Sequence, residues 1–141
     1  PTLTAYENVA LPYLLSGKNP PREQLIAVMN EVGLGHRVDA KVPSMSGGEQ
    51  QRTALARVLA QQPQIVFADE PTGALDSRTS DQIMLVLRDH IDAGVAGILV
   101  THEARMAAWA DRTVFLRDGR IVDRSRGDTL RDLLADTAPG N

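Results

Sequence analysis

The sequence predicts an α/β fold preceded by a helical lobe, and two observations carry this prediction. The first 60 residues hold segments with the 3.6-residue apolar period of helices and no strand-like pattern. The later residues alternate short apolar runs with helical stretches and then reach Asp118-Gly119, a strong hairpin signal. We therefore expect a mostly helical subdomain over residues 1–62 and an α/β part over residues 63–141.

Three helices are expected in the first part. Thr4 suits the N-cap of the first one, and Pro12 predicts a kink or a break inside it. Gly33 suits the end of the second helix, and Pro63 closes the third. The expected helices are Leu3–Gly17, Arg22–Val32 and Gly48–Gln62, with a loop over Gly35–Ser44.

The second part begins with a short apolar run that ends in acids. This run and a later one fit buried strands better than amphipathic ones, because apolar residues follow one another without alternation. The expected strands are Ile65–Ala68 and Ile98–Thr101, with helices over Thr79–Ala93 and Arg105–Ala110. A hairpin pairs Thr113–Leu116 with Arg120–Val122, a last helix covers Thr129–Ala135, and residues 139–141 form a frayed end.

Composition excludes several classes of protein. Apolar residues make up 43% of the 141 residues, which is enough for a core, and the net charge of −3 gives no basic bias toward nucleic acid. The chain has no cysteine, so disulfides and thiolate metal sites are excluded. No apolar run reaches the ~20 residues that span a bilayer. Because the chain lacks both a signal peptide and an initiator Met, we interpret it as an internal fragment, with a processed N-terminus as the alternative.

The segment Ser46-Gly47-Gly48-Glu49 matches a capping box at the start of the third helix. Ser46 is the expected N-cap and Glu49 the third helical residue. The two glycines allow a neighbour to approach the backbone closely, and the free N–H groups of a helix start attract anions. The segment thus predicts an anion site, and the alternative is an ordinary helix start without a ligand.

Asp69 and Glu70 end the first apolar strand, and His102 follows the second one, 32 residues after Glu70. The carboxyl ends of strands in α/β sheets are where ligands bind. One carboxylate could hold Mg²⁺ while the other orients or deprotonates water, and the histidine could donate to a phosphate oxygen. The alternatives are a solvated strand end and a structural histidine.

Five further residues carry no clear chemistry in the sequence. Arg52 and Arg57 are expected to be solvated or ion-paired, and His36 and His90 to lie on the surface. Trp109 is expected to pack rather than to stack on a ligand. Taken alone, the segment Gly73-Ala74-Leu75-Asp76 is a turn before a helix.

Taken together, these segments resemble the motifs of ATP-binding cassette (ABC) ATPases in their order. Met45–Glu49 is similar to the L-S-G-G-Q signature, with Met for Leu and Glu for Gln. The other matching segments are Phe67–Thr72 (Walker B), Gly73–Asp76 (D-loop), Thr101–Glu103 (switch region), Leu3–Val9 (after the glutamine loop) and Asp118–Ile121 (late hairpin). The resemblance implies an incomplete P-loop NTPase fold of the ABC type, with the helical signature subdomain and the later half of the ATPase core.

The resemblance also implies roles for the residues that match its motifs. Asp69 would hold Mg²⁺ through water, Glu70 would be the general base, and His102 would contact the γ-phosphate of ATP. The remaining implied residues face the ATP of a partner subunit or the dimer interface: Ser46, Gly47, Gly48, Glu49 and Asp76.

One expected motif is missing from the chain. No G-x-x-x-x-G-K-[ST] phosphate loop occurs in the 141 residues, and the adenine-stacking aromatic and the glutamine of the glutamine loop are also absent. We therefore expect the chain alone to be inactive as an ATPase. We also expect apolar sheet surface and an unpaired strand edge in such a fragment, which favour self-association.

The residues Leu3–Pro12 and Asp69–Asp76 resemble those of lipoprotein-releasing and macrolide- or peptide-exporting ATPases. This resemblance implies ATP and Mg²⁺ as cofactors, a membrane permease and a second ATP-binding domain in a head-to-tail dimer as partners, and no nucleic acid. It implies a peripheral location on the cytoplasmic face of the membrane. The alternatives are a soluble ABC-type ATPase of translation or DNA repair, or a non-hydrolysing interaction module.

Overall fold

The computed structural model describes residues 2–126 of the chain. These residues divide into two compact units. Unit 1 holds the residues up to Val66 together with Pro71–Ile98, and unit 2 holds Phe67–Glu70 together with the described residues from Leu99 on. The subdomain boundary expected at residue 62 stays a prediction.

Unit 1 begins with helix α1 (Ala5–Leu15), whose start is capped as the sequence predicts. The Thr4 hydroxyl accepts a hydrogen bond from the N–H of Glu7 at 3.1 Å, and the Glu7 carboxylate accepts one from the N–H of Thr4 at 2.7 Å. Of the kink or break expected at Pro12, the break is wrong, because α1 continues through this residue. Buried residues on the preceding turn, Val9 and Ala10, hold this helix against its neighbours.

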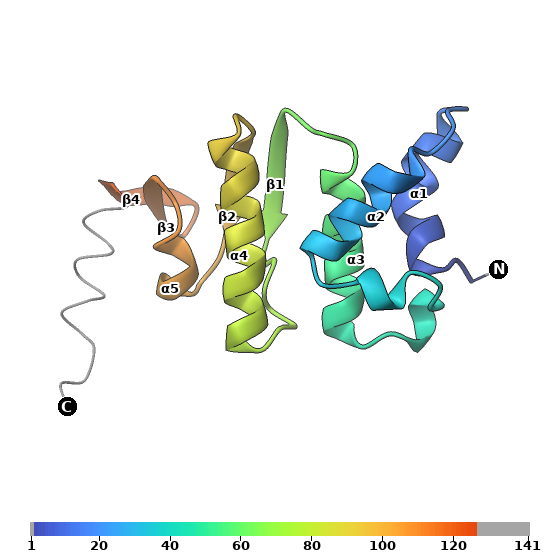
Figure 1. Ribbon diagram of the computed structural model, residues 1–141. Helices are drawn as coiled ribbons and strands as arrows, with labels where there is room; N and C mark the ends of the chain where they lie inside the picture. Colours follow the sequence, from blue (N-terminus) through green and yellow to red (C-terminus); the bar gives the residue numbers. More distant parts are fainter. Residues whose placement is uncertain (1, 127–141) are drawn as a thin grey trace. The chain divides into compact units, whose positions relative to one another are not determined.

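Helices α2 (Arg22–Glu31) and α3 (Gly47–Leu59) pack with α1 into the helical lobe (Figure 1). The lobe has a closed apolar core, whose largest fully buried side chains include Leu25, Met29, Leu34 and Leu59. Gly33 follows α2 with a φ of +73°, a left-handed value that glycine adopts without strain, so its predicted position at the helix end is confirmed.

The segment between α2 and α3 is more ordered than the expected loop. It contains two single turns of 3₁₀-helix, η1 (Gly35–Arg37) and η2 (Val42–Ser44). The N–H of Leu34 donates to the carbonyl of Met29 at 2.7 Å and closes the end of α2. Short 3₁₀ turns satisfy the backbone groups of a connection without a regular period, and no sequence pattern announced them.

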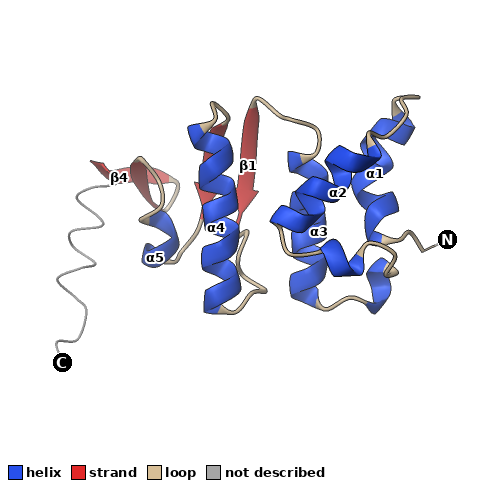
Figure 2. Ribbon diagram, viewed as in Figure 1, coloured by secondary structure: helices blue, strands red, loops and turns tan. Residues whose placement is uncertain are grey.

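Strands β1 (Ile65–Asp69) and β2 (Ala96–Val100) pair directly and are joined through helix α4 (Ser77–Asp92) (Figure 2). The N–H of Ala96 donates to Gln64 near the start of both strands, and the N–H of Glu70 donates to Val100 near their ends. Bonds in this order make the pair parallel, so the carboxyl ends of both strands lie at the same edge.

The expectation that both strands are fully buried is wrong. Val66 is buried, but its neighbours on the other face of β1 are exposed, Ile65 by 44% and Phe67 by 70%. Ile98 and Val100 of β2 are exposed as well. A continuous apolar strand is buried on both faces only when other elements cover both, and within residues 2–126 one face is left uncovered.

Unit 2 continues with the short helix α5 (Ala104–Ala107) and an antiparallel hairpin of β3 (Arg112–Arg117) and β4 (Arg120–Arg126). The turn residues Asp118 and Gly119 both have positive φ values, 51° and 73°, as a two-residue hairpin turn requires. The predicted hairpin is therefore confirmed. The helix predicted over Thr129–Ala135 and the frayed end over 139–141 lie outside the described residues.

Across residues 2–126, no helix combines the length and the apolar character that crossing a bilayer needs.

Two leucines of the helical lobe test its packing. Leu25 is fully buried, whereas Leu15 is 80% exposed at the end of α1. We expect Leu25→Ala to lower the free energy of unfolding by about 2–5 kcal/mol through lost burial and a cavity. Leu15→Ala should change it by less than about 0.5 kcal/mol. Urea denaturation of both variants checks this, and equal effects would contradict the described core.

Candidate functional site

A cluster of side chains lies where β1 and β2 end, within unit 2. Glu70 follows β1 and His102 follows β2. One carboxylate oxygen of Glu70, Oε1, lies 2.6 Å from Nδ1 of the His102 ring and accepts the backbone N–H of His102 at 2.8 Å. The common edge of two parallel strands thus brings these two predicted residues into direct contact.

The second carboxylate oxygen of Glu70 is held by Thr101. The Thr101 hydroxyl donates to Glu70 Oε2 at 3.1 Å and accepts the N–H of Glu103 at 3.1 Å. Sequence reasoning missed this contact, and the only signal for it was a hydroxyl residue beside the histidine. The segment 101–103 therefore supplies three donors to one carboxylate.

The backbone of Glu70 adopts a left-handed conformation, with a φ of +45°. Few residues other than glycine take this conformation, and it costs on the order of 1–3 kcal/mol. The N–H of Glu70 donates to the carbonyl of Val100 at 2.8 Å, which fixes the peptide to the end of β2. Backbone and side chain of Glu70 are thus both tied to the neighbouring strand.

Hydrogen bonds shift the titration of both partners. The His102 ring, followed by the His102 N–H and the Thr101 hydroxyl, holds the pKa of Glu70 below its usual range. The Glu70 carboxylate raises the pKa of His102, and Glu103 adds to this. The His102 side chain is 83% exposed, so its ring faces solvent on the side away from Glu70. The geometry favours an ionised carboxylate beside a protonated ring.

Asp69 is the last residue of β1 and is exposed. Residues 2–126 contain no group of three or more His, Cys, Asp or Glu side chains that could hold a metal ion by themselves. Mg²⁺ at nucleotide sites takes only one or two carboxylates, because phosphates and water supply the other ligands. A single exposed carboxylate at a strand end therefore fits Mg²⁺ that arrives with a nucleotide.

A second cluster lies at the start of α3, within unit 1. Ser46 and Glu49 form the predicted capping box, with Glu49 N–H donating to the Ser46 hydroxyl at 3.2 Å and Ser46 N–H to the Glu49 carboxylate at 2.8 Å. These two bonds leave the N–H groups of Gly47 and Gly48 as the donors of this helix end without an acceptor among the described residues. Their position at the positive end of α3 suits an anion.

The other carboxylate oxygen of Glu49 lies 2.9 Å from Nε of Arg37, which belongs to η1. The Ser46 N–H and the Arg37 charge hold the pKa of Glu49 below its usual range. Glu49 is therefore charged and engaged on both oxygens, as helix cap and as ion-pair partner.

Gly48 packs against the turn that leads to α4. A Cβ at Gly48 would lie 3.1 Å from the carbonyl oxygen of Ala74 and 3.0 Å from the side chain of Leu75, whereas a Cβ at Gly47 would meet its nearest atom at 3.9 Å. The N–H of Ala74 donates to the side chain of Gln51 at 3.1 Å. Glycine at position 48 thus allows a close approach between two predicted motifs that a Cβ would crowd.

Asp76 ends this turn and caps α4. Its carboxylate accepts the N–H of Thr79 at 2.9 Å and the Thr79 hydroxyl at 2.8 Å, and these bonds lower the pKa of Asp76. Sequence reasoning treated the segment as a turn without legible chemistry, although an Asp three residues before a Thr is a recognisable helix start.

Residues 1–73 match the family model described as ABC transporter. The chain belongs to the ABC transporter family. The match covers the signature segment together with Asp69 and Glu70.

Relatives with names identify the branch of the ABC family. The chain is 48% identical over 122 residues to the lipoprotein-releasing system ATP-binding protein LolD of Gluconobacter oxydans, covering 84% of this chain and 53% of that protein. It is 46% identical over 129 residues to the macrolide export ATP-binding/permease protein MacB of Chlorobium luteolum, covering 91% of this chain and 19% of that protein. The chain thus spans about half the length of the LolD relative and a fifth of the MacB relative.

A solved structure supports the ABC fold. The dimeric ABC transporter cassette MJ0796 superposes with a TM-score of 0.80 and 35% identity, over 88% of this chain and 56% of that one. The same cassette is known as a dimer in a post-hydrolysis state bound to ADP and Pi, with the same TM-score. The expected fold, an incomplete P-loop fold of the ABC type, is confirmed.

The ABC signature helix α3 is anchored to α2 by Arg52, which binds backbone carbonyls, whereas the expectation was a solvated or ion-paired side chain. Its Nη1 donates to the carbonyls of Val32 and Gly33, each at 3.1 Å, and its Nε donates to Gly48 at 3.4 Å. An arginine at the end of a helix satisfies carbonyls that lack an intrahelical partner. One side chain thus joins the signature glycine to the end of α2.

Two more residues have partners that the sequence did not predict. Arg57 donates to the side chain of Asn8 in α1 at 3.1 Å, and so links α3 to α1. The His90 side chain is 28% exposed and lies 3.2 Å from Glu31, which pairs α4 with α2. His36 is exposed, as predicted.

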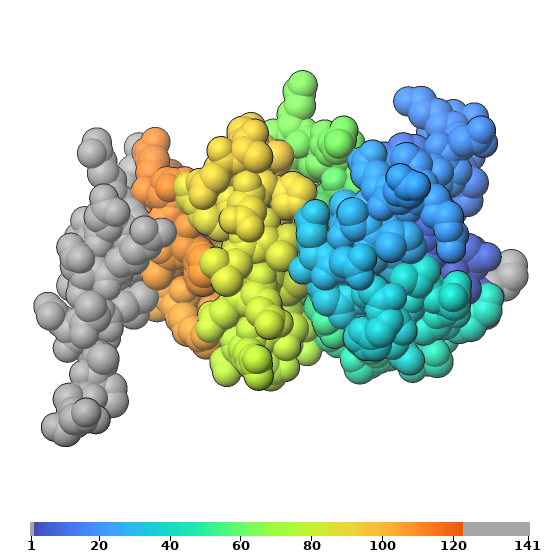
Figure 3. Space-filling model, in the orientation of Figure 1, coloured from blue at the N-terminus to red at the C-terminus, as the bar shows by residue number. Residues whose placement is uncertain are grey.

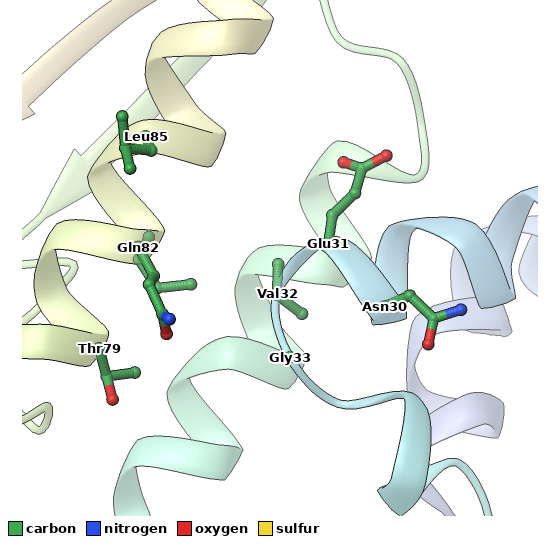
Figure 4. Close-up of a pocket in the computed structure, with 8 residues that line it drawn as sticks. Asn30, Glu31, Val32, Gly33, Thr79, Gln82 and Leu85 are labelled. Carbon is green, nitrogen blue, oxygen red and sulfur yellow. The ribbon is translucent and has the colours of Figure 1, made fainter.

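Glu31 also lines a cavity of about 330 Å³ between the end of α2 and α4 (Figure 4). The space-filling view shows the blue segment of α2 and the yellow segment of α4 meeting on this face (Figure 3). The lining residues are Asn30, Glu31, Val32, Gly33, Thr79, Gln82, Ile83 and Leu85. Val32 and Gly33 are also the residues that Arg52 binds, so the cavity wall and the anchor of the ABC signature helix coincide.

The two signature glycines provide a matched test of the packing. Gly48→Ala should lower the melting temperature of the protein, because its Cβ meets the Ala74 carbonyl at 3.1 Å. Gly47→Ala should leave it unchanged or raise it, since alanine favours a helix by about 1 kcal/mol and meets only ordinary contact. Thermal unfolding of both variants checks this. An unchanged melting temperature in Gly48→Ala would show that the turn does not pack tightly against α3.

The Glu70–His102 pair predicts that the stability of the protein depends on pH. Its contribution to stability is present while Glu70 is ionised and His102 protonated. It is lost as the pH falls through the lowered pKa of Glu70, and as the pH rises through the raised pKa of His102. Glu70→Gln should therefore move the pKa of His102 down toward its usual value, as followed by NMR titration of the ring. Glu103→Gln should move it less, and an equal shift in both variants would contradict the geometry.

Proposed function

We propose that the chain is part of the ATP-hydrolysing subunit of an ABC exporter. The observation that carries the proposal is the direct contact of Glu70 with His102 at the carboxyl ends of paired parallel strands, immediately after Asp69. Membership of the ABC family and relatives named for lipoprotein release and macrolide export support it.

In this proposal the strand-end residues divide the work on ATP. Asp69 holds Mg²⁺ through water, and the ion, when bound, neutralises charge on the phosphates. Glu70 orients the attacking water and takes its proton as an ionised carboxylate, the form that its hydrogen bonds favour. His102 contacts the γ-phosphate, and the high exposure of its ring allows it to exchange Glu70 for a phosphate oxygen.

The signature cluster acts on a second ATP in the same proposal. Ser46, Gly47 and Gly48 face the γ-phosphate of ATP bound by a partner subunit, through the two N–H groups that the capping box leaves to an anion. Glu49 keeps this helix end in shape, and Asp76 lies at the dimer interface. We further propose that residues 1–62 form the helical subdomain and residues 63–141 the later half of the ATPase core.

The proposed partners are a second ATP-binding domain in a head-to-tail dimer and a membrane permease, at the cytoplasmic face of the membrane. The dimers of the related cassette MJ0796 and the ATP-binding/permease name of MacB support this. A translation or repair ATPase is less well supported, because the relatives above are named for transport. No nucleic-acid partner is proposed, since the net charge is −3.

The role of Glu70 is tested in the complete ATP-binding domain. Glu70→Gln should bind ATP as the parent does but hydrolyse it at least ~100-fold more slowly, the scale of a lost general base. Steady-state phosphate release and nucleotide binding are measured side by side. Glu23→Gln, on the exposed side of α2, is the matched control and should leave turnover unchanged. An unchanged turnover in Glu70→Gln would refute the assigned role.

The 141 residues alone should bind ATP weakly or not at all and should not turn it over. They lack the phosphate loop whose backbone and Lys hold the β- and γ-phosphates. Isothermal titration calorimetry with ATP and Mg²⁺ checks this, and micromolar affinity for the isolated chain would refute it.

A further inference from the structure

We infer that Thr101 is a positioning residue that aims the Glu70 carboxylate. The inference rests on the proposed function, in which Glu70 is the base. The Thr101 hydroxyl donates to Glu70 Oε2 at 3.1 Å, while the ring and the backbone N–H of His102 contact Oε1. A carboxylate held at both oxygens by different residues has a fixed plane and a fixed direction for its lone pairs.

The hydroxyl of Thr101 is itself held in one orientation. It accepts the N–H of Glu103 at 3.1 Å, so its proton is directed to Glu70 rather than shared with that backbone group. The chain of bonds runs from the Glu103 N–H through the Thr101 hydroxyl to Glu70. It uses residues 101–103 at the end of the second strand and one residue at the end of the first.

The contact between Thr101 and Glu70 also persists when the His102 ring moves. In the proposed mechanism the ring of His102 leaves Glu70 for a phosphate oxygen, which removes one of the two contacts to Oε1. The contact to Oε2 does not depend on that ring. Thr101 therefore keeps the Glu70 carboxylate in the same orientation while His102 contacts the phosphate oxygen. Orientation matters because a small misplacement of a group that acts on one water molecule lowers the reaction rate strongly.

The test compares two substitutions in the complete ATP-binding domain. Thr101→Val replaces the hydroxyl with a methyl of similar size, and Thr101→Ser keeps the hydroxyl. We expect kcat to fall about tenfold in Thr101→Val, as for the loss of a hydrogen bond to a charged group. The KM for ATP should change less than about twofold, since Thr101 does not bind ATP, and Thr101→Ser should restore most of kcat.

The split between kcat and KM and the rescue by serine separate positioning from mere packing. Equal losses of kcat in Thr101→Val and Thr101→Ser, or a rise in KM as large as the fall in kcat, would overturn the inference.

Glu70→Gln is measured beside them to separate this inference from the proposed function. If Glu70→Gln keeps full turnover, the proposed function fails and the inference with it. If Glu70→Gln is inactive but Thr101→Val is as active as the parent, only the inference fails. Should valine prevent folding, which thermal unfolding detects, Thr101→Ala takes its place with the same expected outcomes.

Discussion

The close approach of Gly48 to the carbonyl of Ala74 is the constraint on which the rest of unit 1 depends. It fixes the distance between the start of α3 and the turn that leads to α4. The same helix reaches α2 through Arg52 and α1 through Arg57. Because one helix makes all of these contacts, its capped start is held from several sides, and the donors of Gly47 and Gly48 keep a fixed direction.

Local rules of sequence predicted much of this unit. Thr4 and Ser46 were recognisable as N-caps because each is followed three residues later by Glu, and the structure has both capping boxes. Gly33 and the Asp118-Gly119 turn were recognisable because their backbone angles favour glycine. The break predicted at Pro12 does not occur, because tertiary packing outweighs the loss of one backbone hydrogen bond in this short helix.

The features that sequence could not predict depend on distant partners. Arg52 and Val32 are separated by 20 residues, and His90 and Glu31 by 59, so no local period announces either contact. The exposure of Phe67 could not be predicted for the same reason, because other elements of the structure determine whether a strand is covered. By contrast, the meeting of Glu70 with His102 follows from the topology alone, since two parallel strands end at one edge. Thr101 escaped notice because a hydroxyl beside a strand has many ordinary uses.

The left-handed backbone of Glu70 has a consequence for the choice of residue at this position. Glycine or asparagine would adopt a φ of +45° more readily than glutamate, so either would relieve strain of the order of 1–3 kcal/mol. Neither residue carries a carboxylate with the reach of glutamate. Under the proposed role of Glu70, the residue that would stabilise the fold most and the residue that hydrolysis would need are therefore different.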